Sequence, residues 1–239
     1  MARQLARAGL PPRSLTAVCV THHHSDHNID VGAVVHLAWC ADLSTPVAVI
    51  GPPPLRRMMD AYVEVARVDV ETRVVDEGRP PFEDLLDVRE IASAGTVFED
   101  DRVRITCARV DHPPMDAYAY RIDADDRSYV ISGDTAPCDS LVALARGADI
   151  LVHEVLDVPS IATLEQHTNG HRLREHLIAS HTSATDVAAI ASAAGVRTLV
   201  LSHLVPSQPD LPDGYWLEQV RSGATFAGDV VVGRDLMEL

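Results

Sequence analysis

No run of about eighteen apolar residues, the length needed to cross a membrane as a helix, occurs in this sequence of 239 residues. The N-terminal residues 1–7 also lack the apolar stretch of a secretory signal. We therefore expect a cytoplasmic protein with no membrane partner.

Cysteine and positive charge are scarce as well. The four cysteines lie far apart without any Cys-x-x-Cys spacing, which excludes a small disulfide-stapled fold and indicates reduced thiols. The 20 Lys and Arg residues are outnumbered by 35 Asp and Glu, which gives a formal net charge of −15. Such a charge disfavours broad attraction to nucleic acid or to an anionic membrane, although a local basic patch is compatible with it.

What the sequence does contain is enough apolar residues, 46% of the total, to bury a sizeable core. We expect one domain over residues 1–239, built from strands that alternate with helices. The pattern predicts strands at 15–21, 46–51, 103–108, 118–122, 128–132, 149–155 and 198–202. It predicts helices at 29–39, 55–70, 140–146 and 185–194, and gives no clear structure for 76–96.

Histidine and carboxylate side chains gather where the predicted strands end. The first strand leads directly into the run Thr21-His22-His23-His24-Ser25-Asp26-His27. Later strands are followed by further imidazole and carboxylate groups, and functional side chains held on loops at strand ends are the common way to build a site. Two metal ions that share one bridging carboxylate need roughly seven protein ligands. The available set is His22, His24, Asp26, His27, His112, Asp134 and His203.

The run from His22 to His27 resembles the H-x-H-x-D-H signature of the metallo-β-lactamase superfamily, and the later candidates follow in the family's order. This resemblance implies an α/β (α+β) fold, the αββα sandwich, with two divalent metal ions, zinc before manganese or iron. It also implies roles for the ligands. The first metal would be bound by His22, His24 and His112, the second by Asp26, His27 and His203, and Asp134 would bridge them. We expect His23 to point away, and we interpret His36, His167, His171 and His176 as surface or core residues.

Two later segments resemble one branch of this superfamily. Residues 148–155 are similar to the ribonuclease Z loop that reads His-Glu-Ala-Thr, and residues 180–184 are similar to its His-x-Thr loop. The resemblance implies that Glu154 and His181 assist proton transfer. The C-terminal residues 228–236 are more similar to the arylsulfatase-like branch.

Two departures from the family pattern affect the interpretation. Only 21 residues precede His22, where family members have several strands, so we expect a sandwich that lacks N-terminal strands. A sheet left with an open edge favours association into a homodimer. In addition, residues 113–133 suffice for one hairpin, whereas bacterial ribonuclease Z enzymes often carry a long RNA-gripping arm at this place.

The sequence therefore favours a two-metal hydrolase that uses a metal-bridging hydroxide to cleave a small ester: a sulfate, a phosphodiester, or a carboxylic ester or lactone. Asp26 would orient the nucleophile, and His181 with Glu154 would protonate the leaving oxygen. One alternative is a ribonuclease Z-like endonuclease that processes the 3′ end of tRNA, with nucleic acid as the less favoured partner. The other is a catalytically impaired metal-binding protein.

Overall fold

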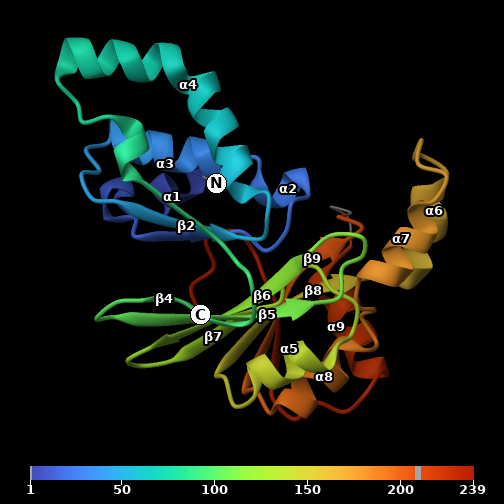
Figure 1. Cartoon of the computed structure of the whole chain (residues 1–239). Coiled ribbons are helices and arrows are strands. Elements are labelled where there is room, and N and C mark those ends of the chain that lie inside the picture. Colours follow the sequence, from blue (N-terminus) through green and yellow to red (C-terminus); the bar gives the residue numbers. More distant parts are fainter. Residues whose placement is uncertain (1, 208–210) are drawn as a thin grey trace. The chain divides into compact units, whose positions relative to one another are not determined.

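The computed structural model describes residues 2–207 and 211–239, which fall into two compact units (Figure 1). The first unit consists of Met1–Ala92 and Asp235–Leu239, and the second of Ser93–Arg234. No helix within the described residues is both long enough and apolar enough to span a membrane.

The first unit is built on a parallel sheet, whose described strands run in the order β1-β2-β3. They are β1 (Ala17–Cys19), β2 (Val47–Gly51) and β3 (Leu86–Glu90). The central strand β2 is buried along its whole length, as expected for a continuous apolar run in a parallel sheet. The helices are α1 (Ala2–Arg7), α2 (Ser25–Asn28), α3 (Val31–Cys40) and α4 (Leu55–Glu77), with 3₁₀ turns at Pro12–Ser14 and Phe82–Leu85. The core packs α3 and α4 on the sheet through residues that include Val35, Trp39, Val49, Met59 and Phe82.

Helix α4 is longer than the sequence pattern predicted. It continues past Val70 to Glu77 and ends at Gly78, whose φ of 69° lies in the left-handed region that glycine readily adopts. Over its last turns Arg73 makes ion pairs one turn away on both sides, with Asp69 and Glu77. These pairs stabilise the exposed end of the helix, which buries no residue after Val70.

The second unit is built on a mixed sheet, whose described strands run in the order β10-β9-β8-β7-β6-β5-β4. Strands β4 to β7 are antiparallel neighbours, and β7 to β10 are parallel. The strands are β4 (Gly95–Glu99), β5 (Val103–Val110), β6 (Ala117–Ala124), β7 (Ser128–Ile131), β8 (Ile150–Leu156), β9 (Thr198–Val205) and β10 (Asp229–Val232). The helices are α5 (Asp139–Ala145), α6 (Ile161–Glu165), α7 (Leu173–Ser180), α8 (Val187–Ala194) and α9 (Asp213–Ser222), with a 3₁₀ turn at Val158–Ser160.

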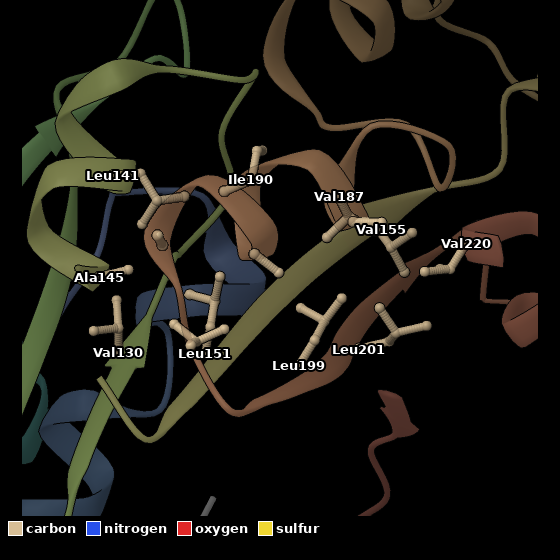
Figure 2. Packing of buried hydrophobic residues seen from close by; sticks show 14 of the residues in the cluster. Val130, Leu141, Ala145, Leu151, Val155, Val187, Ile190, Leu199, Leu201 and Val220 are labelled. Carbon is tan, nitrogen blue, oxygen red and sulfur yellow. The ribbon is translucent and has the colours of Figure 1, made fainter. Parts of the chain in front are cut away.

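The core of the second unit lies between this sheet and the helices α5 and α8 (Figure 2). Leu151 of β8 and Leu199 and Leu201 of β9 are fully buried and face Leu141 of α5 and Val187 of α8. Burying such a side chain contributes about 1.5–3 kcal/mol. The carboxyl ends of these buried strands are therefore held firmly in place.

Most predicted elements occur within a few residues of their expected bounds. Residues 76–96, for which the pattern gave no structure, contain the end of α4, a 3₁₀ turn, β3 and the start of β4. The hairpin predicted between His112 and Asp134 is formed by β6 and β7, which pair in antiparallel register from Tyr120↔Ile131 to Asp123↔Ser128.

Candidate metal centre

The histidine-rich loop of the first unit continues from the end of β1. Val20 N–H donates to the Ile50 carbonyl at 2.7 Å, which extends the sheet by one residue before the loop begins. Gly51 makes this packing possible, because a Cβ there would lie 2.9 Å from Val20 Cβ and 3.2 Å from the Val20 carbonyl. The close approach of β2 therefore fixes the point at which the loop leaves the sheet.

The loop brings three imidazoles together. His22 is fully buried, and its Nε2 lies 3.0 Å from His24 Nδ1. The His27 ring centroid lies 4.1 Å from that of His22, and His27 Nε2 is 3.4 Å from Asp26 Oδ2. All four predicted ligands of this loop thus form one cluster within the first unit.

His23 lies between these ligands but serves the loop itself. Its Nε2–H donates to the Pro52 carbonyl at 2.7 Å, and its Nδ1 accepts from Asn28 Nδ2 at 3.0 Å. Both ring nitrogens are used, so this side chain holds the loop against the turn after β2.

In the second unit, backbone irregularities at two strand ends place Asp134 and His203. Gly133, with a φ of 60°, turns the chain after β7 so that Asp134 becomes buried. His203 is the extra residue of a β-bulge in β9, since Glu154 pairs with Ser202 and Val155 with Leu204. Its φ is 43°, a conformation that non-glycine residues seldom adopt and that is often found at functional sites. Its Nε2 lies 3.6 Å from Asp134 Oδ2.

His112 follows β5 and is buried. Its Nδ1 lies 2.9 Å from the Ser180 carbonyl, which can only accept, so Nδ1 carries the proton and Nε2 keeps a lone pair. A metal-binding histidine normally donates its other N–H in this way. The tautomer of His112 therefore suits a ligand that binds through Nε2.

Glu154 and His181 lie side by side, as the loop resemblance implied. His181 Nδ1 is 3.2 Å from Glu154 Oε1, and both side chains are buried. The same carboxylate oxygen accepts backbone N–H bonds from Thr135 at 3.1 Å and Thr182 at 3.0 Å. Glu154 thus ties the Asp134 loop to the His181 loop while it orients the imidazole.

His181 is also placed as a potential metal ligand. Its ring stacks on that of His203 with centroids 6.0 Å apart, and one ligand atom each of Asp134, His181 and His203 falls within 4.8 Å of the others. The resemblance of its loop implied only a role in proton transfer for His181. The order of the motif carries no signal for this proximity, which arises because β7 and β9 flank β8 in the sheet.

Three further residues of this site were not predicted. Thr182 Oγ1 donates to the Thr135 carbonyl at 2.7 Å and so closes the two loops on each other. His176 of α7 lies with its ring centroid 5.6 Å from that of His112 and 5.9 Å from that of His181. Thr135 and Thr182 belong to the motifs Gly-Asp-Thr and His-Thr, so the sequence could have identified them as site residues. No motif includes His176.

The groups present fit divalent transition-metal ions. Imidazole nitrogens that face each other at 3.0 Å, and a buried carboxylate beside imidazoles, are the ligand types that such ions select. Among the described residues, the predicted ligands lie in one cluster of each unit. The cluster of the first unit contains His22, His24, Asp26 and His27, and that of the second contains His112, Asp134, His181 and His203.

Comparison with known proteins agrees with this chemistry. The family model described as a beta-lactamase superfamily domain matches residues 1–204. Ribonuclease Z from Mycobacterium bovis (strain BCG / Pasteur 1173P2) is 33% identical over 238 residues, which cover 98% of this chain and 82% of that protein. Ribonuclease Z from Mycobacterium marinum is 34% identical over 241 residues, with the same two coverages.

Solved structures share the fold at lower identity. Human tRNase Z, short form, has a TM-score of 0.67 at 19% identity and covers 98% of this chain and 82% of its own. The metallo-beta-lactamase fold protein YhfI from Bacillus subtilis has a TM-score of 0.64 at 20% identity, with coverages of 95% and 78%. The mixed α/β architecture is therefore the metallo-β-lactamase fold. The chain belongs to the metallo-β-lactamase superfamily, in its ribonuclease Z branch, and is a metal-dependent hydrolase of ester bonds.

Proposed function

We propose that this protein is a ribonuclease Z-like endonuclease that hydrolyses a phosphodiester bond at the 3′ end of tRNA precursors. The observation that carries the proposal is the 33% identity to a ribonuclease Z over 98% of the chain. The contact between Glu154 and His181, on the two loops that resemble that branch, supports it. These findings favour the RNA substrate over the small ester that the sequence pattern had favoured.

We further propose that the two ligand clusters belong to one two-metal centre, and that residues 1–239 act as a single hydrolase domain. His22, His24 and His112 would hold the first ion, Asp26, His27 and His203 the second, and Asp134 would bridge them. Bound divalent ions would activate water and polarise the phosphoryl oxygens as Lewis acids. Zinc is the favoured ion because imidazole predominates among the ligands.

The remaining chemistry is assigned to side chains of this chain. Asp26 is exposed in the first turn of α2 and would accept a proton from the attacking water. His181, oriented by Glu154 at 3.2 Å, would give a proton to the oxygen that leaves phosphorus. The attack forms a P–O bond to water and breaks the P–O bond to the leaving nucleotide. The proton lost by water and the proton gained by the leaving oxygen balance.

The short β6–β7 hairpin changes how RNA would be held. Between His112 and Asp134 the structure contains only this hairpin, with the bounds Ala117–Ala124 and Ser128–Ile131, as the sequence predicted. Binding must therefore rest on other surfaces than an arm at this place. We expect relatively few phosphate contacts, and hence a weak dependence of binding on salt.

The test is cleavage of a labelled precursor tRNA, compared with nitrophenyl phosphodiester and nitrophenyl sulfate. We expect cleavage at the 3′ end of the acceptor stem with a kcat/KM at least about 100-fold above that for the small esters, since remote binding contributes to catalysis. Asp134→Ala should reduce all hydrolysis about 10³-fold, and exposed Asp139→Ala on α5 serves as its control.

Each other outcome supports a different function. If the protein hydrolyses small esters but neither cleaves precursor tRNA nor binds it at low salt, its substrate belongs to the small-ester class. If the protein binds metal but hydrolyses neither precursor tRNA nor the nitrophenyl esters, it is a metal-binding protein without catalytic activity. Full activity in Asp134→Ala would overturn the assignment of the metal ligands.

A further inference from the structure

A second group of ligand-type side chains lies in the first unit, outside the histidine-rich loop. His36 and Cys40 are one helical turn apart on α3, so they share a face of that helix. Asp69 lies on α4, which packs against α3. One nitrogen, one sulfur and one oxygen from these residues lie within 4.8 Å of one another.

The His36 imidazole points toward this group of ligand atoms and contacts Asp69 there. Its side chain is 13% exposed, and Nε2 lies 3.0 Å from Asp69 Oδ2. Nε2 is buried, and its contact with this carboxylate has poor hydrogen-bond geometry although the two groups interact electrostatically. A bound cation would hold the nitrogen and the carboxylate oxygen together at one point.

The groups around the imidazole fix its orientation. Its Nδ1 lies 3.3 Å from the Tyr62 hydroxyl, and the rings of Trp39 and Phe82 lie 5.5 Å and 5.1 Å from its centroid. An Nδ1–H that donates to Tyr62 leaves the lone pair on Nε2, the arrangement found around metal-binding histidines. The ring is thus set in place before any ligand binds.

The carboxylate and the thiol complete the group. Arg73 Nε donates to both oxygens of Asp69, at 3.0 and 3.2 Å, and so anchors the carboxylate while Oδ2 faces His36. Cys40 is a half-buried free thiol. A plain ion pair between His36 and Asp69 needs no sulfur beside it, whereas nitrogen, sulfur and oxygen together are the ligand types of zinc.

We propose that His36, Cys40 and Asp69 bind a zinc ion that links α3 to α4, with water as a fourth ligand. Zinc holds such atoms at about 2.0–2.3 Å, so the three atoms need only side-chain rotations to surround one ion. The site is separate from the proposed catalytic centre, whose ligands include no cysteine. Its expected effect is on the stability of the first unit rather than on turnover.

The absence of cysteine from the catalytic ligands gives a selective test. The full chain, stripped of metal and kept reduced without added thiol, is titrated with Co²⁺. A thiolate bound to cobalt gives a charge-transfer absorption in the near ultraviolet that histidine and carboxylate ligands do not give. We expect this band in the wild type, with an amplitude corresponding to one thiolate per chain.

Variants then assign the band. Cys40→Ser should abolish it and remove one zinc per chain in elemental analysis, with ester hydrolysis unchanged. Cys138→Ser, which alters another half-buried thiol, should retain it. Tyr62→Phe should keep the band but weaken cobalt binding about tenfold, because it removes the partner of Nδ1.

The outcomes are decisive in both directions. The proposal is overturned by a wild-type protein that shows no band with excess cobalt, or by a band that survives Cys40→Ser. It is also overturned if Cys40→Ser retains the wild-type zinc content. Circular dichroism of each variant establishes that the chain is folded in every comparison.

Discussion

At the scale of single residues, Glu154 combines two tasks in one oxygen atom. Oε1 accepts backbone N–H bonds from Thr135 and Thr182 and also faces His181 at 3.2 Å. Truncation would remove both tasks at once, so a loss of activity after truncation would not separate them. An isosteric amide does separate them, because its oxygen still accepts the backbone bonds but carries no charge.

We therefore predict that Glu154→Gln folds normally and loses about 100-fold in kcat with little change in KM, since proton transfer by the imidazole is impaired. Steady-state kinetics on the phosphodiester and thermal unfolding are the measurements. Glu165→Gln, at an exposed glutamate of α6 paired with Arg174, is the control. An unchanged kcat would leave Glu154 with only its structural task.

His153, next to Glu154, makes stability depend on pH. Its side chain is completely buried, and this burial holds its pKa below the usual value of 6.5. The folded protein therefore keeps the imidazole neutral at pH values where the unfolded chain protonates it. The resulting stability is fully present above about pH 6.5 and is lost as the pH falls toward the folded-state pKa.

We predict that urea unfolding of metal-stripped wild type loses up to about 1.4 kcal/mol more than His153→Asn when the pH falls from 6.5 to 5.5. The two proteins are compared by how their free energies of unfolding change with pH, and not by their stabilities at one pH. The substitution itself lowers stability, because it removes packing and the Nδ1–H bond to the Glu154 carbonyl. Parallel pH dependences in the two proteins would contradict a lowered pKa of His153, because they would mean that folding does not change its proton binding.

At the scale of elements, the close contact of β2 with the end of β1 sets the position of the histidine-rich loop. The only side chain that fits at position 51 is hydrogen, since a Cβ would meet both Val20 Cβ and its carbonyl. Displacing Val20 would move His22, which follows two residues later.

Gly51→Ala is thus predicted to destabilise the protein by about 1–3 kcal/mol and to weaken metal binding. Chemical denaturation and metal titration of the stripped protein are the measurements. Gly78→Ala at the end of α4 is a useful comparison. A Cβ there meets nothing within 4 Å, so only backbone strain from its positive φ contributes and metal binding should not change. Equal effects on metal binding would contradict the steric explanation.

The elements also show what the sequence could and could not predict. Strands such as 46–51 were predicted because a short apolar run that ends at prolines favours a buried strand. The prediction ended helix α4 too early, at Val70, because the last turns of the helix bury no residue. They are held by ion pairs of Arg73, which apolar periodicity does not detect. The bulge at His203 was not predictable either, since it follows from the pairing of β8 with β9 rather than from local sequence.

The candidate site was predicted unevenly for the same reason. The ligands of the first unit lie within six residues, so their spacing alone indicated metal binding. The proximity of His176 and His181 to the other candidate ligands depends on how α7, the loop after β7 and the bulge of β9 meet in space. Substrate class was the weakest inference, because it relied on the net charge and on the short segment between His112 and Asp134. Recognition of RNA depends on the local arrangement of charges and not on their sum.

At the scale of the whole molecule, bound metal should contribute directly to stability. The ligands of the proposed centre include buried His22, His112 and Asp134, whose lone pairs and charge are best satisfied by a cation. At 100 times its Kd, an ion stabilises the folded state by up to about 2.7 kcal/mol, reduced by any binding to the unfolded chain.

We predict that a chelator lowers the Tm by roughly 5–10 °C, because about 2–4 °C corresponds to 1 kcal/mol for a chain of this size. Calorimetry with and without chelator measures the change, and re-addition of zinc should restore it. In Asp134→Ala most of the difference should disappear. A Tm that is insensitive to the chelator in the wild type would mean that metal binding is not coupled to folding.

The spacing of the ligands along the chain also affects the order of events during folding. His22, His24 and His27 are neighbours in sequence, so they can capture an ion in a chain that has no tertiary structure. His112, Asp134 and His203 span about ninety residues and meet only after non-local parallel strands have paired, which is a slow process. Early capture by the first set also stabilises the unfolded chain. Recovery of active protein on refolding should therefore be higher when zinc is added after collapse than when it is present from the start.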